Sequence, residues 1–205
     1  MSRRRRRVSG PIPAWIRRAR RANKLTALLR RLALTGCLLA VAGGLVACGE
    51  EEPGVDEPAR EGLAIELDGV DYNVFITRQL NPEITPDDAY VAEDPPPGQT
   101  LYGVFIQVCN VSDDQRTPAD EFVVLDNQGN RFEPEELPED NQFAYQARPL
   151  DPEECIPEAG SVAQLGPTAG SMLLFELPLQ TTENRPLELE VEGEGDEHLT
   201  FELDI

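Results

Sequence analysis

Lysine is absent from the sequence after Lys24, and histidine occurs only once, as His198. Residues 48–205 contain six arginines and all 38 acidic residues, which gives this part a formal charge of −32. Nucleic acids are bound through basic side chains that neutralise phosphates, and anionic lipid surfaces attract basic segments. The lack of positive charge therefore excludes binding to DNA or RNA, and polybasic docking to membranes, for residues 48–205.

The same scarcity restricts catalysis and metal binding. With no lysine and one histidine, the Ser-His, Cys-His and Ser-Lys pairs that activate nucleophiles are nearly unavailable. Zinc would lack nitrogen and sulfur ligands, and copper would have only His198 and Met172. Alternation along the last apolar run places His198 on an outward face. We therefore expect a surface histidine, no transition-metal site and no cofactor.

The positive charges that the chain does have are concentrated at its start. Residues 1–47 hold 12 basic residues and no acidic one, and the apolar run LALTGCLLAVAGGLVA follows Arg31. This run is shorter than the roughly 20 residues that a membrane-spanning helix needs. A basic region before a short apolar run is typical of a signal peptide, which we predict over residues 1–47. The Arg30-Arg31 pair leaves both the twin-arginine and the general secretory route open.

The apolar run ends in Leu45-Val46-Ala47-Cys48, which is similar to the lipobox of bacterial lipoproteins. The resemblance implies that the Cys48 thiol is lipidated and that the mature protein is anchored in the bilayer, on the extracytoplasmic face of the cell membrane. An ordinary signal peptide with a chance cysteine at its end is the alternative. Residues 48–61 are rich in Glu, Pro and Gly, and we expect a disordered acidic tether there.

From residue 62 onward the apolar residues recur with a period of two, in short runs separated by Gly, Pro, Asn and Asp. This pattern is typical of half-buried strands. Residues 101–111 are apolar on both faces and are expected to form a central strand, and residues 126–130 are expected to form a turn. We predict a two-sheet antiparallel β-sandwich of seven to nine strands over residues 62–205. The sets expected to face inward are Leu63, Ile65 and Leu67; Tyr72, Val74 and Ile76; Leu173, Phe175 and Leu177; Leu187, Leu189 and Val191; and Leu199, Phe201, Leu203 and Ile205.

Four of these segments carry a family resemblance. They are DYNVFITR at residues 71–78, GVFIQVCNVSDD at 103–114, FVVLDNQGNRF at 122–132 and LLFELP at 173–178. Together they resemble the extracellular immunoglobulin-like domains of unknown function that are found on many bacterial lipoproteins and are related to an immunoprotective secreted antigen. The resemblance covers about residues 63–205 and implies an immunoglobulin-like sandwich. It supplies no catalytic residue.

Two of the four cysteines remain for a structural role. Cys37 lies in the expected signal peptide and Cys48 is the expected lipid site, which leaves Cys109 and Cys155 in an oxidising compartment. Thiols in such a compartment commonly pair, so we predict a disulfide between them. Two free buried thiols are the alternative.

Two long loops, residues 81–98 and 133–160, interrupt the strand pattern. Long loops on a rigid sandwich commonly carry binding sites. Their aromatic residues Tyr90, Phe143 and Tyr145 are therefore candidate contacts to an envelope protein or glycan. Loops that merely cover sheet edges are the alternative. The leading interpretation of the whole chain is a non-enzymatic, lipid-anchored binding or interaction module.

The acidic residues permit two other interpretations. Two carboxylates are enough for glycoside hydrolysis, so an envelope hydrolase is one of them. A calcium-responsive structural module is the other, with weak calcium binding at Asp87-Asp88, Asp113-Asp114 or Asp126-Asn127, although none of these follows the EF-hand pattern. With 38 acidic residues no pair stands out, and a solvated acidic surface is the ordinary explanation.

Overall fold

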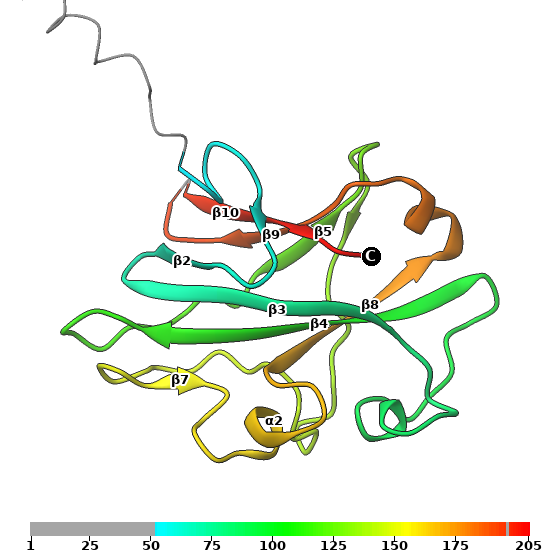
Figure 1. The fold of residues 1–205 in the computed structure, drawn as a ribbon, viewed down its shortest axis with the longest axis horizontal. Coiled ribbons are helices and arrows are strands. Elements are labelled where there is room, and N and C mark those ends of the chain that lie inside the picture. Colours follow the sequence, from blue (N-terminus) through cyan, green and yellow to red (C-terminus); the bar gives the residue numbers. More distant parts are fainter. Residues whose placement is uncertain (1–51, 196) are drawn as a thin grey trace, which may run out of the picture. The chain divides into compact units, whose positions relative to one another are not determined.

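The structure is a computed structural model that describes residues 52–195 and 197–205. The unit Glu51–Ile205 consists of two β-sheets packed face to face, with a layer of loops outside one of them (Figure 1). The expected β-sandwich is therefore confirmed. The expected signal peptide over residues 1–47 and the expected lipid site Cys48 lie outside the described residues. Within the described ranges, no helix is long and apolar enough to cross a membrane.

The first sheet has five strands in the order β1-β10-β9-β5-β6. All its pairings are antiparallel except the one between β1 and β10, which is parallel. The strands are β1 (Ala59–Arg60), β5 (Phe122–Leu125), β6 (Arg131–Phe132), β9 (Leu187–Glu192) and β10 (His198–Leu203).

The second sheet is antiparallel and also has five strands. Its order is β2-β3-β4-β7, and β8 also pairs with β4. The strands are β2 (Ala64–Leu67), β3 (Val70–Leu80), β4 (Gln99–Asn110), β7 (Cys155–Ile156) and β8 (Ser171–Pro178). The described residues thus hold ten strands where seven to nine were expected, because three of them are only two residues long.

The helices are short. They are η1 (Asp87–Ala89), α2 (Val162–Leu165) and η2 (Leu179–Glu183). The side chain of Ser161 caps α2 by accepting a hydrogen bond from the amide of Gln164. In Figure 1, η1 and α2 lie below the second sheet, on the side away from the first.

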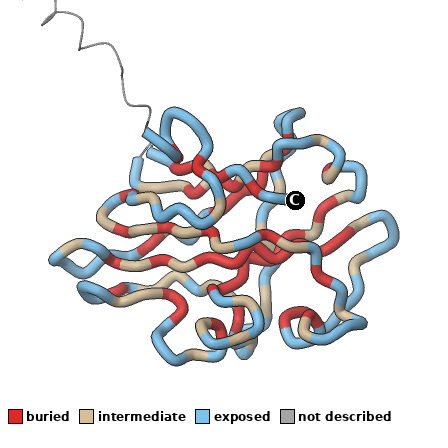
Figure 2. Tube along the Cα trace, viewed as in Figure 1, coloured by how far each residue is buried: buried red, intermediate tan, exposed pale blue. Residues whose placement is uncertain are grey.

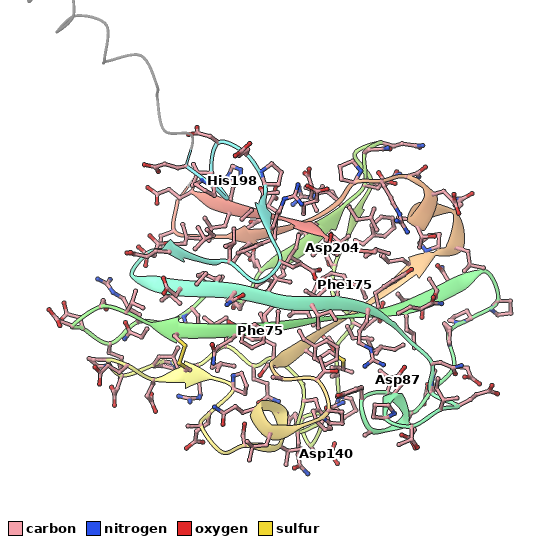
Figure 3. The ribbon with its side chains drawn as sticks, viewed as in Figure 1. Phe75, Asp87, Asp140, Phe175, His198 and Asp204 are labelled. Atoms are coloured by element: carbon pink, nitrogen blue, oxygen red, sulfur yellow. A yellow bond between two sulfur atoms is a disulfide. The ribbon has the colours of Figure 1, made fainter. Side chains whose placement is uncertain are left out.

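An inner core fills the space between the sheets, and it is made almost wholly of alternating strand residues. The expected inward sets on β8, β9 and β10 are buried here, and Phe175 and Phe201 have no exposed surface. Figure 3 labels Phe175 in the middle of the sandwich. His198, at the start of β10, is exposed as expected.

Strand β4 is buried on both faces, as its sequence predicts. Val104, Ile106 and Val108 belong to the inner core, whereas Leu101 and Phe105 face the other way. Those two residues lie in a second cluster, here called the outer cluster, which forms under the loop layer. Figure 2 shows buried segments in these loops as well as along the central strands. The members of the outer cluster are Leu80, Tyr90, Val91, Leu101, Phe105, Phe143, Ala163, Met172 and Leu174.

Two expected inward residues are exposed. A β-bulge at Phe75 shifts the register of β3, so that Val74 pairs with Ile106 but Ile76 pairs with Phe105. The expectation for Ile76 is therefore wrong: it is 43% exposed, and Thr77 is buried in its place. Leu63 is 48% exposed because β2 begins one residue after it. Alternation alone does not reveal an inserted residue.

The expected tether is partly wrong as well. Residues 52–61 do not form a free chain in the structure: β1 pairs with β10, and Ala59 is buried in the inner core. The amide of Thr200 also donates a hydrogen bond to the carbonyl of Gly54. Backbone pairing and one small apolar side chain order this segment despite its composition. The folded unit therefore begins before residue 62.

The expected disulfide is present. Cys109 on β4 and Cys155 on β7 are direct partners in the sheet and are joined by a disulfide bond. It links the second sheet to the end of the loop of residues 133–160.

Candidate binding groove

The two long loops pack on the outer face of the second sheet and contact each other there. The ring of Tyr90 lies edge-on to Phe105 of the sheet at 5.1 Å and to Phe143 of the other loop at 4.7 Å. The Tyr90 hydroxyl accepts a hydrogen bond from the amide of Thr168 at 3.0 Å, and the Tyr90 carbonyl accepts one from the side chain of Asn141 at 2.9 Å. Tyr90 thus joins both loops to the sandwich.

A partly buried ion pair holds the first loop. Asp87 of η1 has a side chain that is 4% exposed and pairs with the guanidinium of Arg78 on β3. The other Asp87 oxygen accepts a hydrogen bond from the amide of Asn81 at 3.0 Å, and Arg78 also donates to the hydroxyl of Thr168 at 3.2 Å. Asp87 is thus occupied in fixing the loop, which leaves it unavailable as a cation ligand.

The aromatic residues expected to contact a partner are not exposed side chains. Tyr90 is 1% exposed and Phe143 is 9% exposed. Tyr145 packs against the inner core with its ring edge-on to Phe122 at 5.1 Å, and its hydroxyl donates to the carbonyl of Ala119 at 2.7 Å. Burial raises the pKa of Tyr145. Contact with a partner needs accessible rings, whereas these rings cover apolar surface that the sheets leave open.

A groove of about 760 Å³ lies between the same two loops. Its apolar lining includes Tyr90, Leu101, Leu137, Phe143 and Leu174, which are members or neighbours of the outer cluster. Figure 3 shows Asp87 and Asp140, one from each loop, on this lower side of the molecule. We call this site the acidic groove.

The charged lining of the acidic groove has one sign only. Seven carboxylates line it and no arginine does. They come from the first loop, the second loop and β8, so they gather only in the folded chain. These residues are Asp88, Glu93, Asp94, Glu135, Glu136, Asp140 and Glu176.

A second groove of about 600 Å³ lies on the other side of the segment that contains Glu135, Glu136 and Leu137, all of which line both grooves. It is lined by Glu121, Glu192 and the cation Arg131. Arg131 pairs with Glu190 at 3.1 Å and with Glu192 at 3.2 Å. The second groove is therefore partly neutralised, unlike the acidic groove.

The second groove holds a pair of interacting carboxyl groups. A hydrogen bond with Glu192 and the negative charge of Glu192 raise the pKa of Glu121.

Of the expected calcium ligands, Asp87 and Asp126 are engaged in contacts within the protein. Asp126 accepts hydrogen bonds from Asn130, Gln128 and Asn184, which lower its pKa to about 2, the Asn130 side chain most strongly. Asp113 and Asp114 are exposed. Among the residues that the structure describes, no three His, Cys, Asp or Glu side chains are grouped so that they could hold a metal ion.

Sequence reasoning found the loops and two aromatic residues of the lining, but not most of the groove carboxylates. Tyr90 and Phe143 do line the acidic groove, though as buried parts of its lining, and Tyr145 lines the second groove. The groove carboxylates Glu93, Glu135 and Glu176 were not singled out. In a chain with 38 acidic residues, only the fold distinguishes those that meet.

No protein-family model matches the chain, and no curated protein matches it by sequence. Solved structures with a similar fold include a putative lipoprotein, ycdA, from Bacillus subtilis, at 14% identity and a TM-score of 0.44, covering 69% of this chain and 38% of that one. An uncharacterized β-sandwich protein from Clostridium difficile is similar at 15% identity and a TM-score of 0.43, covering 75% of this chain and 100% of that one. The yjhA protein of Bacillus subtilis is similar at 9% identity and a TM-score of 0.43, covering 71% and 98%.

Proposed function

We propose that the protein is a lipid-anchored, extracytoplasmic binding module without enzymatic activity, and that it binds its partner in the acidic groove. The observation that carries this proposal is the groove itself. Two long loops pack on a sandwich and form a groove that is lined by apolar side chains and by seven carboxylates. Concave apolar sites with a few polar groups are the usual form of ligand sites.

The composition of the groove favours binding over catalysis. Its lining contains no serine, threonine, cysteine, histidine or lysine, so the only groups of a nucleophilic type that it holds are its carboxylates and the Tyr90 hydroxyl. The Tyr90 hydroxyl is occupied by the amide of Thr168. The charged groups that remain are carboxylates, which suit recognition of a positively charged partner.

The same geometry favours a protein partner over a glycan. Sugar rings are commonly bound by stacking on exposed aromatic faces, which requires accessible rings. Tyr90 packs edge-on against Phe143 and against Phe105 within the outer cluster, and Tyr90 and Phe143 are both buried. They shape the groove without offering a stacking platform.

Location outside the cytoplasm is supported by the disulfide and by the lipobox-like residues. A disulfide between Cys109 and Cys155 is stable in an oxidising compartment and uncommon in the cytosol. We expect Cys48→Ala to abolish membrane retention or processing of the full chain, as measured by fractionation and by the size of the product. A Cys48→Ala protein of wild-type size that stays in the membrane fraction would contradict lipid anchoring.

Photocrosslinking in intact cells tests the binding role. A photoreactive amino acid at Gln142, an exposed residue that lines the acidic groove, should give a discrete crosslinked product in the full-length, anchored protein. The same amino acid at Ala159, which is exposed but lines neither groove, is the matched control. Products that are identical at both positions, or the lack of a discrete product at Gln142, would contradict a binding site in this groove.

A further inference from the structure

We infer that the occupant of the acidic groove is an extended basic peptide segment that alternates lysine or arginine with apolar side chains. This inference rests on the proposed function, since it names the partner class of the same site. Three features of the groove carry it: the sign of its charge, its apolar lining, and a strand edge that borders it.

Charge gives the first requirement. The carboxylates of Glu93, Glu176 and Asp140 approach the groove from three separate segments, and no arginine in the lining neutralises them. The second groove differs, because Arg131 there bonds Glu190 and Glu192. Opposite charge on the partner would offset the repulsion among these groups and would speed its association. The occupant is therefore cationic.

The apolar lining gives the second requirement. Leu101 and Leu174 lie on neighbouring strands of the second sheet, and Leu137 and Val162 approach from the loop layer. Val162 is 48% exposed, so the folded chain leaves apolar surface uncovered at this site. A purely hydrophilic cation would leave that surface in water. The occupant therefore carries apolar groups between its charges.

The edge of β8 gives the third requirement. The segment around Phe143 and Tyr145 covers this edge at Met172, through hydrogen bonds of 2.6 and 2.9 Å. The amide of Glu135 then bonds the carbonyl of Leu174 at 2.7 Å.

Beyond that point the edge of β8 is open. Within the part of the chain that the structure describes, no backbone group bonds the amide or the carbonyl of Glu176 on the side away from β4. Extended peptides pair with such open edges, and their side chains then alternate between the two faces. A peptide can meet all three requirements together, because backbone pairing, apolar contact and charge each use a different part of it.

Peptide titration tests the inference. The probe is an acetylated and amidated peptide of sequence Lys-Val-Lys-Leu-Lys-Ser, titrated by calorimetry into the mature chain with Cys48→Ser to prevent acylation. One control peptide has Glu in place of each Lys, and the other has Ser in place of Val and Leu. We expect binding of the first peptide, no binding of the Glu peptide, and binding at least about tenfold weaker for the peptide without apolar residues, since burial of apolar side chains adds to affinity.

Three variants with equal loss of charge locate the binding. Glu93→Gln with Glu176→Gln alters the acidic groove alone, and Glu121→Gln with Glu133→Gln alters the second groove alone. Glu188→Gln with Glu202→Gln alters a facing pair on the first sheet. We expect about a fivefold loss of affinity for the first variant and less than twofold for the others, because only nearby charges act strongly in salt solution.

The outcomes separate this inference from the proposed function. If all three variants lowered the affinity for the Lys peptide equally, binding would depend only on the net charge of the protein, and the inference would be overturned. Equal binding of the Glu peptide, or no binding of the Lys peptide, would overturn it too. If the Gln142 crosslink still forms in either of those cases, the groove binds something other than a basic peptide, and only this inference fails. Loss of that crosslink would contradict the proposed function itself.

Discussion

The two apolar clusters on either face of β4 are built in different ways. The inner core is made by strands, whose alternate residues from both sheets meet between them. The outer cluster takes Leu101 and Phe105 from β4 but depends on Tyr90 and Phe143 from two loops to cover them. Regular backbone pairing positions the first cluster, whereas a few specific contacts position the second. The comparison indicates that the sandwich supplies most of the stability and that the loop layer forms the acidic groove.

Close packing makes the outer cluster specific despite its irregular backbone. Gly103 on β4 lies where Phe105, Leu80 and Met172 crowd together, and a Cβ atom there would meet the Phe105 ring at 2.9 Å. The absence of a side chain allows these three residues to pack over the strand. These strand residues form the close-packed part of the outer cluster, to which the loops add Tyr90 and Phe143.

The largest effect is expected in the inner core. Phe201→Ala removes a side chain with no exposed surface, and it should lower the free energy of unfolding by up to about 5 kcal/mol through lost burial and a cavity. Urea denaturation measures this loss. Phe132→Ala is the matched control, since Phe132 is only partly buried on the short edge strand β6, and its loss should be clearly smaller. Equal losses would contradict a core centred on β10.

The disulfide should have the next largest effect. Replacing Cys109 and Cys155 together by Ser should lower the free energy of unfolding by about 4 kcal/mol, because the bond closes a loop with a sequence separation of 46 residues. Mass spectrometry of wild-type protein purified from the envelope should find no free thiol in the folded unit. Two alkylatable thiols in that material would refute the pairing.

A smaller effect is expected in the outer cluster. Phe143→Ala should cost about 3 kcal/mol, since the ring is buried against Tyr90. The neighbouring variant Gln142→Ala changes an exposed side chain and should alter stability by less than about 0.5 kcal/mol. Thermal denaturation of both variants is the measurement. An unchanged Phe143→Ala transition would mean that the ring is free to contact a partner after all.

The ion pair below the first loop should show a local effect. Arg78→Ala leaves the buried Asp87 carboxylate without its cation and should cost about 2 kcal/mol, less than for a fully buried pair because the Arg78 side chain is 30% exposed. Hydrogen exchange should speed up in residues 81–98 before it does in the inner core. Replacing both partners together should recover part of the loss. Uniform loss of protection would show that the loop and the sandwich unfold as one unit.

The smallest effect is a change with pH in the turn after β5. Hydrogen bonds lower the pKa of Asp126 to about 2 from the usual 3.8, so its ionised form stabilises the folded state above about pH 4. That stabilisation is lost as the pH falls from about 4 to 2. The difference in stability between wild type and Asp126→Asn should therefore narrow over this range, as measured by urea denaturation. A constant difference would contradict the lowered pKa.

Much of the sandwich and of its inner core could be predicted from the sequence. Alternation identified β8, β9 and β10 with their inward faces, the two apolar faces of β4, the turn between β5 and β6, and the outward position of His198. These features depend on alternation along a strand and on the residue types in a turn. Both involve only residues that are close together in the chain. Elimination among four cysteines was enough for the disulfide.

Only the tertiary structure decided the bulge at Phe75, the order of residues 52–61 and the burial of Tyr90 and Phe143. It also decided which carboxylates line the acidic groove, where Glu93 of the first loop, Glu135 of the second and Glu176 of β8 come together. Each of these depends on contacts between segments far apart in the chain. A local sequence pattern indicates whether a residue can be buried. Which residues cover it, and which charged residues lie next to it, depends on how the sheets and loops pack.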